Sequence, residues 1–202
     1  MFFKIVSLFL KAEFVVQDFN TTGPLNIYNE SLRYSQHLIK VWSGSKHELH
    51  VPATLLSILA ANNKHIPGFR MKLSLKVNSG KLQIIAKDEG PGFPESMETS
   101  VRSGKGNCQL FSIVPWNEGM GLCNLINITV KFCAGEVLIY SVSKKFRTKF
   151  FFKQEQGIVR LISERLSVNN PIINKTPVLK AVKGTYVETV IPLTNLYKFI
   201  PR

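Results

Sequence analysis

The sequence predicts a single α/β (α+β) two-layer sandwich, with a mixed, mostly antiparallel sheet and helices on one face. The chain has 202 residues, of which 45% are hydrophobic and 19% charged, which suits one well-filled globular domain. Segments with helical spacing of apolar residues are interspersed with segments that alternate like strands. Two of the strand segments are joined by the turn Asn78-Ser79-Gly80, so they form an antiparallel hairpin.

Residues 1–47 are predicted to supply strands and one helix, as part of the main domain or appended to it. One or two strands are expected at 2–18 and a helix at 30–42, where apolar residues recur at helical spacing. The apolar stretch Ile5–Leu10 is too short for a signal-peptide core, and Lys11 interrupts it. No segment reaches the ~18 apolar residues of a membrane span. We therefore expect a cytoplasmic protein without a membrane partner.

The main domain is predicted at 48–193 and begins with a helix over 51–64. Pro52 suits the first turn of this helix, and Pro67-Gly68 ends it. Its apolar face is formed by Leu55, Leu56, Leu59 and Ala60. The next segment, Phe69–Val77, alternates between apolar and polar residues and leads through the turn into the strand that ends at Asp88.

The second half of the chain is predicted to hold one helix and several strands. The helix is expected at 119–132 and a glycine, Gly135, ends it. The predicted strands are Glu136–Val142, Lys144–Gln154, a further strand within Gly157–Leu166, and the strand that follows Gly184-Thr185. A polar loop at 167–183 precedes the last strand, and residues 194–202 form a short peripheral tail.

The chain carries a formal net charge of +13, which favours an anionic partner such as a nucleotide, a nucleic acid, an acidic protein or a membrane surface. The basic residues are scattered, so no dedicated nucleic-acid arm is indicated. Basic and aromatic residues alternate within Lys144–Gln154, a pattern that can bind single-stranded nucleic acid by stacking. An amphipathic strand with one solvated face is the commoner explanation.

Three cysteines, Cys108, Cys123 and Cys133, occur without a CxxC spacing. This pattern argues against a disulfide framework and against a structural zinc site. We expect Cys123 and Cys133 to pack as small apolar residues, in a reducing compartment.

The clearest motif is Asp88-Glu89-Gly90-Pro91-Gly92, directly after an apolar strand. The carboxylate of Asp88 sits on a stiff element, while Gly90 and Gly92 leave the adjacent backbone bare. A flat ligand could lie against this turn and donate a hydrogen bond to the carboxylate. An ordinary loop with a capping aspartate is the alternative.

A second motif, Gly119-Met120-Gly121-Leu122, opens the predicted helix at 119–132. Free backbone N–H groups at a helix start, together with the helix dipole, favour a phosphate there. A third motif is Gly184-Thr185 before the last strand.

The order of these motifs resembles the Bergerat ATP-binding fold of the GHKL superfamily. The nearest resemblance is to the ATP-binding domain of histidine kinases and to stand-alone, anti-sigma-type proteins, and it covers about residues 48–193. It implies ATP or ADP on the helix side of the sheet, with Asp88 accepting the adenine amino proton and Gly90 and Gly92 letting the base approach. It also implies that Gly119, Met120, Gly121 and Leu122 hold phosphate, that Gly104, Lys105 and Gly106 contact phosphates from a lid, and that Thr185 supports the adenine.

The same resemblance locates a magnesium-binding asparagine and a water-activating glutamate on the helix at 51–64. Aligned on Lys64-His65, the glutamate position falls on Ser57 and the asparagine position on Ala61. Asn62 or Asn63 could bind Mg²⁺ only with a shift in register. Serine alone cannot act as a general base at neutral pH, so the resemblance does not favour hydrolysis.

The sequence therefore predicts an ATP- or ADP-binding module that acts as a nucleotide-dependent regulator or binds a protein partner. Two alternatives stay open: a protein serine kinase of the anti-sigma type, and a degenerate domain that binds protein or nucleic acid through its basic surface. Whether the protein is an enzyme and whether it forms a homodimer also stay open.

Overall fold

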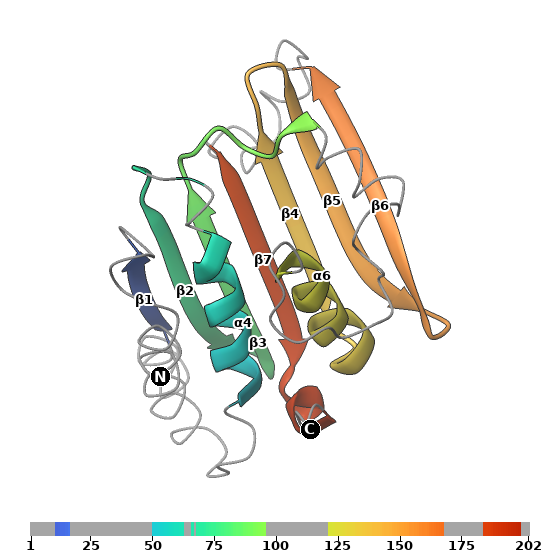
Figure 1. Cartoon of the computed structure of the whole chain (residues 1–202). Helices are drawn as coiled ribbons and strands as arrows, with labels where there is room; N and C mark the ends of the chain where they lie inside the picture. Colours follow the sequence, from blue (N-terminus) through green and yellow to red (C-terminus); the bar gives the residue numbers. More distant parts are fainter. Residues whose placement is uncertain are drawn as a thin grey trace.

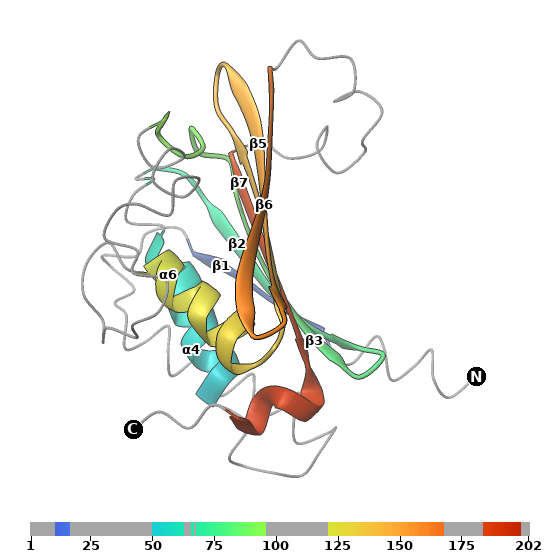
Figure 2. The same cartoon turned by 90° about the vertical axis from the view of Figure 1, so that its right-hand side faces the viewer.

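A computed structural model describes residues 11–16, 50–62, 66, 68–95, 121–167 and 184–198. These residues form a two-layer α+β fold, with one sheet and helices against one face (Figure 1). In the second view, α4 and α6 lie on the same side of the sheet (Figure 2). The predicted sandwich with helices on one face is confirmed for the described part of the chain.

The sheet has seven strands in the order β1-β2-β3-β7-β4-β5-β6. Their bounds are β1 Lys11–Val16, β2 Met71–Asn78, β3 Lys81–Asp88, β4 Glu136–Val142, β5 Phe146–Glu155, β6 Ile158–Ser167 and β7 Thr185–Pro192. All six neighbouring pairs are antiparallel. The described sheet is thus more regular than the mixed, mostly antiparallel sheet that we expected.

Helix α4 spans His50–Ala61, and α6 spans Gly121–Ile126. Helix α6 continues without a break into a π-helix, η3, at Asn127–Phe132. A short 3₁₀ helix, η4, follows β7 at Leu193–Lys198. The predicted helices at 51–64 and 119–132 correspond to α4 and to α6 with η3, whereas the helix predicted at 30–42 lies outside the described residues.

Alternation in the strands builds the core. Met71, Leu73, Leu75 and Val77 of β2 are buried, and the polar residues between them are more exposed. The β2–β3 pairing places these residues opposite Asp88, Ala86, Ile84 and Leu82. The apolar face predicted for the helix at 51–64 packs on this layer, with Leu55, Leu56, Leu59 and Ala60 all buried. The predicted hairpin is therefore confirmed, and so is the prediction that Met71, Leu73, Leu75 and Val77 lie together on one face of it.

The chain's last described segment is less peripheral than predicted. We expected a tail from residue 194 onward, but Leu196 of η4 is completely buried in the core cluster together with Leu193. The backbone N–H of Leu193 donates to the carbonyl of Gly80 at 2.9 Å, which fixes η4 beneath the β2–β3 turn.

The cysteine prediction was half right. Cys133 is a free, buried thiol, as expected. Cys123 is also buried, but it is disulfide-bonded, and its partner lies outside the described residues.

In the described part of the chain, no helix is both long enough and apolar enough to cross a membrane.

Candidate functional site

Asp88 is the last residue of β3 and lies at the end of the sheet face that the helices cover. The residue is only 8% exposed. The Oδ1 atom accepts two backbone hydrogen bonds, from Gly90 N–H at 2.8 Å and from Thr185 N–H at 3.0 Å. The carboxylate thus joins the turn after β3 to the first residue of β7, 97 residues further along the chain.

The bonds to Asp88 leave room for another donor. An ionised carboxylate offers about four acceptor positions. The two backbone N–H groups use two of them. Both backbone bonds end on Oδ1, so Oδ2 keeps acceptor capacity for a ligand N–H.

Burial sets the ionisation of this carboxyl. Desolvation raises the pKa of Asp88 above its ordinary value of 3.8, and the hydrogen bonds from Gly90 and Thr185 offset part of that rise. Because the folded-state pKa is the higher one, the folded state binds more protons than the unfolded state between the two pKa values. The contribution of Asp88 to stability is therefore greatest below pH 3.8 and falls as the pH rises through the folded-state pKa.

This linkage gives a testable pH dependence. Replacing Asp88 with asparagine removes the titrating group and keeps an oxygen that can accept the two backbone N–H groups. We expect the unfolding free energy of the wild type, minus that of D88N, to decrease as the pH rises from 3.8 through the folded-state pKa of Asp88. Urea unfolding at several pH values measures it, and a difference that grows with pH would contradict the assigned direction.

A row of small polar residues continues from Asp88 across the sheet. Thr185 on β7 pairs with Ser141 on β4, and Ser141 pairs with Thr148 on β5. All three are buried on the helix-covered side. This row was missed by sequence reasoning, which singled out Thr185 alone. Ser141 and Thr148 are isolated hydroxyl residues in apolar strands, and no local pattern marks them.

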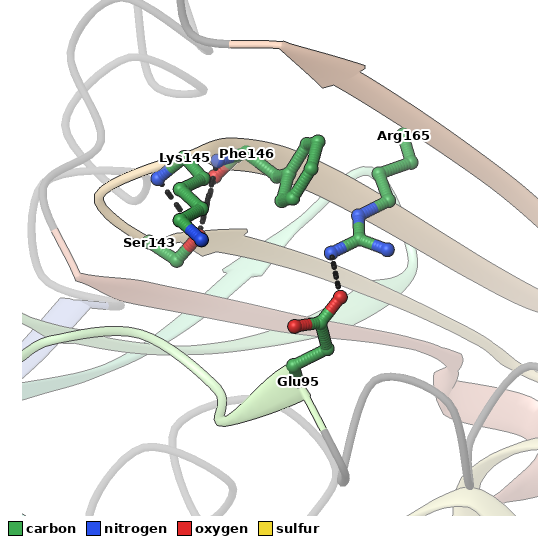
Figure 3. A network of polar contacts seen from close by, with 5 residues as sticks. All are labelled: Glu95, Ser143, Lys145, Phe146 and Arg165. Atoms are coloured by element: carbon green, nitrogen blue, oxygen red, sulfur yellow. Dashed lines mark hydrogen bonds and ion pairs between the residues drawn. The ribbon is translucent and has the colours of Figure 1, made fainter.

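The loop that follows β3 crosses this row, and Figure 1 shows it as the green segment running over the strand ends. Phe93 N–H donates to Ser141 Oγ at 2.7 Å, and its ring stacks on Phe150 with centroids 6.5 Å apart. Glu95 forms an ion pair with Arg165 of β6 at 3.1 Å (Figure 3). The guanidinium of Arg165 also lies 3.6 Å from the centre of the Phe146 ring. The loop is thus bonded to β4 and β6.

The glycines of the loop are required by close contacts inside the protein. Gly92 has φ +76°, and a Cβ there would lie 2.5 Å from the carbonyl oxygen of Val142. A Cβ on Gly90 would lie 2.8 Å from Ile66 Cγ2. These contacts explain both glycines without a ligand. The predicted role of Gly90 and Gly92 in admitting a base stays a prediction.

Gly184 has the tightest surroundings of the site and was not among the predicted site residues. Its φ is +74°, and a Cβ would lie 2.4 Å from Asp88 Oδ1 and 2.6 Å from Gly90 N. The bare backbone of Gly184 is what lets Asp88 reach the N–H of Thr185. The Gly-Thr dipeptide before a strand was the available signal.

The end of α4 meets the start of α6 on the same side of the sheet. A Cβ on Gly121 would lie 3.6 Å from Ile58 Cγ2 and 3.7 Å from Asn62 Oδ1. One predicted metal ligand, Asn62, therefore lies beside one predicted phosphate-binding residue, Gly121. Leu122, the next residue of α6, is buried in the core.

The two possible helix registers place different residues at the water-activating position. With Asn62 as the metal-binding asparagine, the position four residues earlier is Ile58, and with Ala61 it is Ser57. Ser57 is buried, and within the described residues its hydroxyl has no hydrogen-bond partner. Neither position offers a carboxylate, so this helix supplies no general base in either register.

Five predicted site residues lie outside the described ranges: Gly104, Lys105, Gly106, Gly119 and Met120. The second predicted metal ligand, Asn63, also lies outside them. Among the described residues, no group of three or more His, Cys, Asp or Glu side chains could hold a metal ion. The amide oxygen of Asn62 fits a Mg²⁺ ion only if phosphates and water supply most of its ligands.

No protein-family model matches the chain, and no curated protein matches it. Among solved structures, it is similar to the ATPase and transducer domains of DNA topoisomerase II from Balamuthia mandrillaris, with 16% sequence identity and a TM-score of 0.39. The match covers 74% of this chain and 40% of that chain. At this TM-score, no detail of that protein is transferred to this one.

Proposed function

We propose that this chain binds ATP or ADP and uses the bound nucleotide to regulate a protein partner. The observation that carries the proposal is the placement of Asp88. A buried carboxylate, fixed through Oδ1 by two backbone N–H groups, keeps acceptor capacity at the helix-covered end of the central strands. A fixed acceptor in a desolvated position suits recognition of an exocyclic amino group, such as that of adenine.

The contact between Asn62 and Gly121 supports a phosphate position near the base position. Ile66 links the two regions, because it follows α4 and lies against Gly90 beside Asp88. In this arrangement the start of α6 would contribute N–H groups to phosphate, and Asn62 would hold a Mg²⁺ ion carried by the phosphates. Bound Mg²⁺ would neutralise phosphate charge.

The side chains of α4 favour nucleotide binding without hydrolysis. Ser57 and Ile58 occupy the positions where a water-activating carboxylate would stand, and neither can accept a proton at neutral pH. The proposal is therefore a nucleotide-dependent switch. Phosphate transfer to a partner would revive the kinase alternative.

The central test compares ATP and GTP binding by the wild type and D88N. Adenine presents an amino donor at the position where guanine presents a carbonyl acceptor. We expect the wild type to prefer ATP, and D88N to lose ATP affinity by about tenfold or more because an amide N–H₂ would face the amino group. The ATP-to-GTP preference should therefore decrease in D88N. Isothermal titration calorimetry provides the affinities.

Asparagine at this position keeps an acceptor for the backbone N–H groups, so thermal unfolding should confirm that D88N remains folded. Unchanged ATP affinity in folded D88N would exclude Asp88 as the adenine acceptor. Titrations of Asn62→Ala with and without Mg²⁺ test the phosphate end. We expect Mg²⁺ to strengthen ATP binding less in that variant than in the wild type, with metal-free affinity preserved.

A further inference from the structure

Strand β6 forms one edge of the described sheet, and within the described residues it pairs only with β5. It is 10 residues long and contains neither proline nor glycine. Two of its isoleucines are among the large hydrophobic side chains that solvent reaches, with Ile158 55% and Ile162 44% exposed. A long edge strand with exposed apolar residues is a ready template for pairing with another strand.

The two faces of β6 differ. Val159 and Leu161 pack against the core on the helix-covered side. Side chains alternate along a strand, so Ile158, Arg160, Ile162 and Glu164 lie on the opposite face, where all four are exposed. Arg160 and Glu164 are four residues apart, which in a strand is about 13 Å. Opposite charges on β6 are thus too far apart to pair within it.

Strand geometry limits how two copies of β6 can pair around a two-fold axis. In an antiparallel pair, opposed residues must both direct their backbone groups toward the partner or both away from it, and their side chains lie on one face. The side-chain face and the direction of the backbone groups both alternate from one residue to the next. Two residues that face each other across two copies of β6 must therefore both be even-numbered or both be odd-numbered. The two-fold axis must therefore lie at a position where one residue of β6 faces the same residue of the other copy.

Four residues nearest the middle of β6 can serve as that axis: Leu161, Ile162, Ser163 and Glu164. With Glu164 central, each Glu164 carboxylate faces its own copy, which is unfavourable. With Leu161 central, Arg160 faces Ile162 and Glu164 faces Ile158. With Ser163 central, Ile162 faces Glu164 and Arg160 faces Leu166. With Ile162 central, Arg160 faces Glu164 in both directions, Ile158 faces Leu166, and Ile162 faces its copy. Cross-strand pairs of opposite charge or of apolar residues are favourable, so Ile162 is the best centre.

The ion pairs that Arg160 and Glu164 already make within the chain would compete only weakly with pairing between two copies. Glu164 lies 3.9 Å from Lys149, and Arg160 lies 3.9 Å from Glu155. Both ion pairs are long, and at least one partner of each is well exposed, so they contribute little to stability.

We propose that β6 is a self-association edge, at which two copies of this chain pair antiparallel about Ile162 and join their sheets into one. The interface is isologous: each Arg160 faces the Glu164 of the other copy, and the exposed isoleucines lie in the contact. The proposal is independent of nucleotide binding.

The test uses charge reversal and its rescue, with the full chain studied by sedimentation velocity at several concentrations. We expect the wild type to dimerise at about 100 µM or below. R160E and E164R each place like charges opposite each other twice per dimer, so each should raise the dimer Kd by about tenfold or more. The double variant R160E/E164R restores opposite charges and should return the Kd to within about threefold of the wild type.

The matched control is Lys72→Glu, a charge reversal on β2, whose backbone is paired on both sides by β1 and β3. It should leave the dimer Kd unchanged. Circular dichroism melting confirms that each variant is folded. A monomeric wild type at about 1 mM would overturn the proposal. So would two single variants that dimerise like the wild type, or a double variant that is no tighter than the singles.

Discussion

Gly184→Ala is expected to destabilise the protein by about 3 kcal/mol or more, through left-handed backbone strain and steric overlap together. The residue has φ +74°, which an L-residue adopts at a cost. Its added Cβ would lie 2.4 Å from Asp88 Oδ1 and 2.8 Å from the Asp88 carbonyl oxygen. One of these atoms is backbone, so rotation of a side chain cannot relieve the overlap. Urea unfolding of the variant measures the loss.

The matched control is Gly157→Ala. Gly157 lies in the β5–β6 turn with φ +78°, and no atom lies within 4 Å of the Cβ that alanine would add. It should therefore show only the conformational cost of about 1–2 kcal/mol. The difference between the two variants isolates the close approach at Asp88. Equal losses would show that the space around Gly184 imposes nothing beyond its φ.

The strands and the helix layer were predictable because their signals are local. Alternation along β2, the Asn78-Ser79-Gly80 turn and the apolar face of α4 each show within a short window of sequence. The position of β7 was not predictable from such windows. This C-terminal strand lies between β3 and β4, and that insertion depends on pairing between residues about 100 positions apart.

In the candidate site, too, the residues marked by local motifs were predicted and those that depend on long-range contacts were not. Asp88 and Thr185 were identified from motifs, and the structure joins them by a hydrogen bond. Ser141 and Gly184 were missed, because their importance comes from what the loop after β3 contacts. The Ser141 hydroxyl accepts from a residue 48 positions earlier, and Gly184 touches a carboxylate nearly 100 positions earlier. The Ser141 contact leaves no mark in the local sequence, whereas the Gly184-Thr185 dipeptide marked its position but not its contact with Asp88.

Asp88→Ala is expected to lower the unfolding free energy by about 2–4 kcal/mol, because it removes the acceptor of two buried N–H groups. Gly90 and Thr185 would each keep a donor with no partner at the site where β3 and β7 meet. The loss is partly offset because alanine also removes a desolvated carboxyl, whose burial is unfavourable.

D88N separates the two contributions. The asparagine oxygen can accept both backbone N–H groups, and the amide carries no charge to desolvate, so its stability should lie within about 1 kcal/mol of the wild type. Stability and binding would then diverge: D88N stays folded and loses adenine recognition, whereas Asp88→Ala loses both. If Asp88→Ala proves as stable as D88N, the hydrogen bonds to Oδ1 do not fasten β7 to β3. The carboxylate would then have no structural role, and a ligand would be the remaining reason for a buried acid at this position.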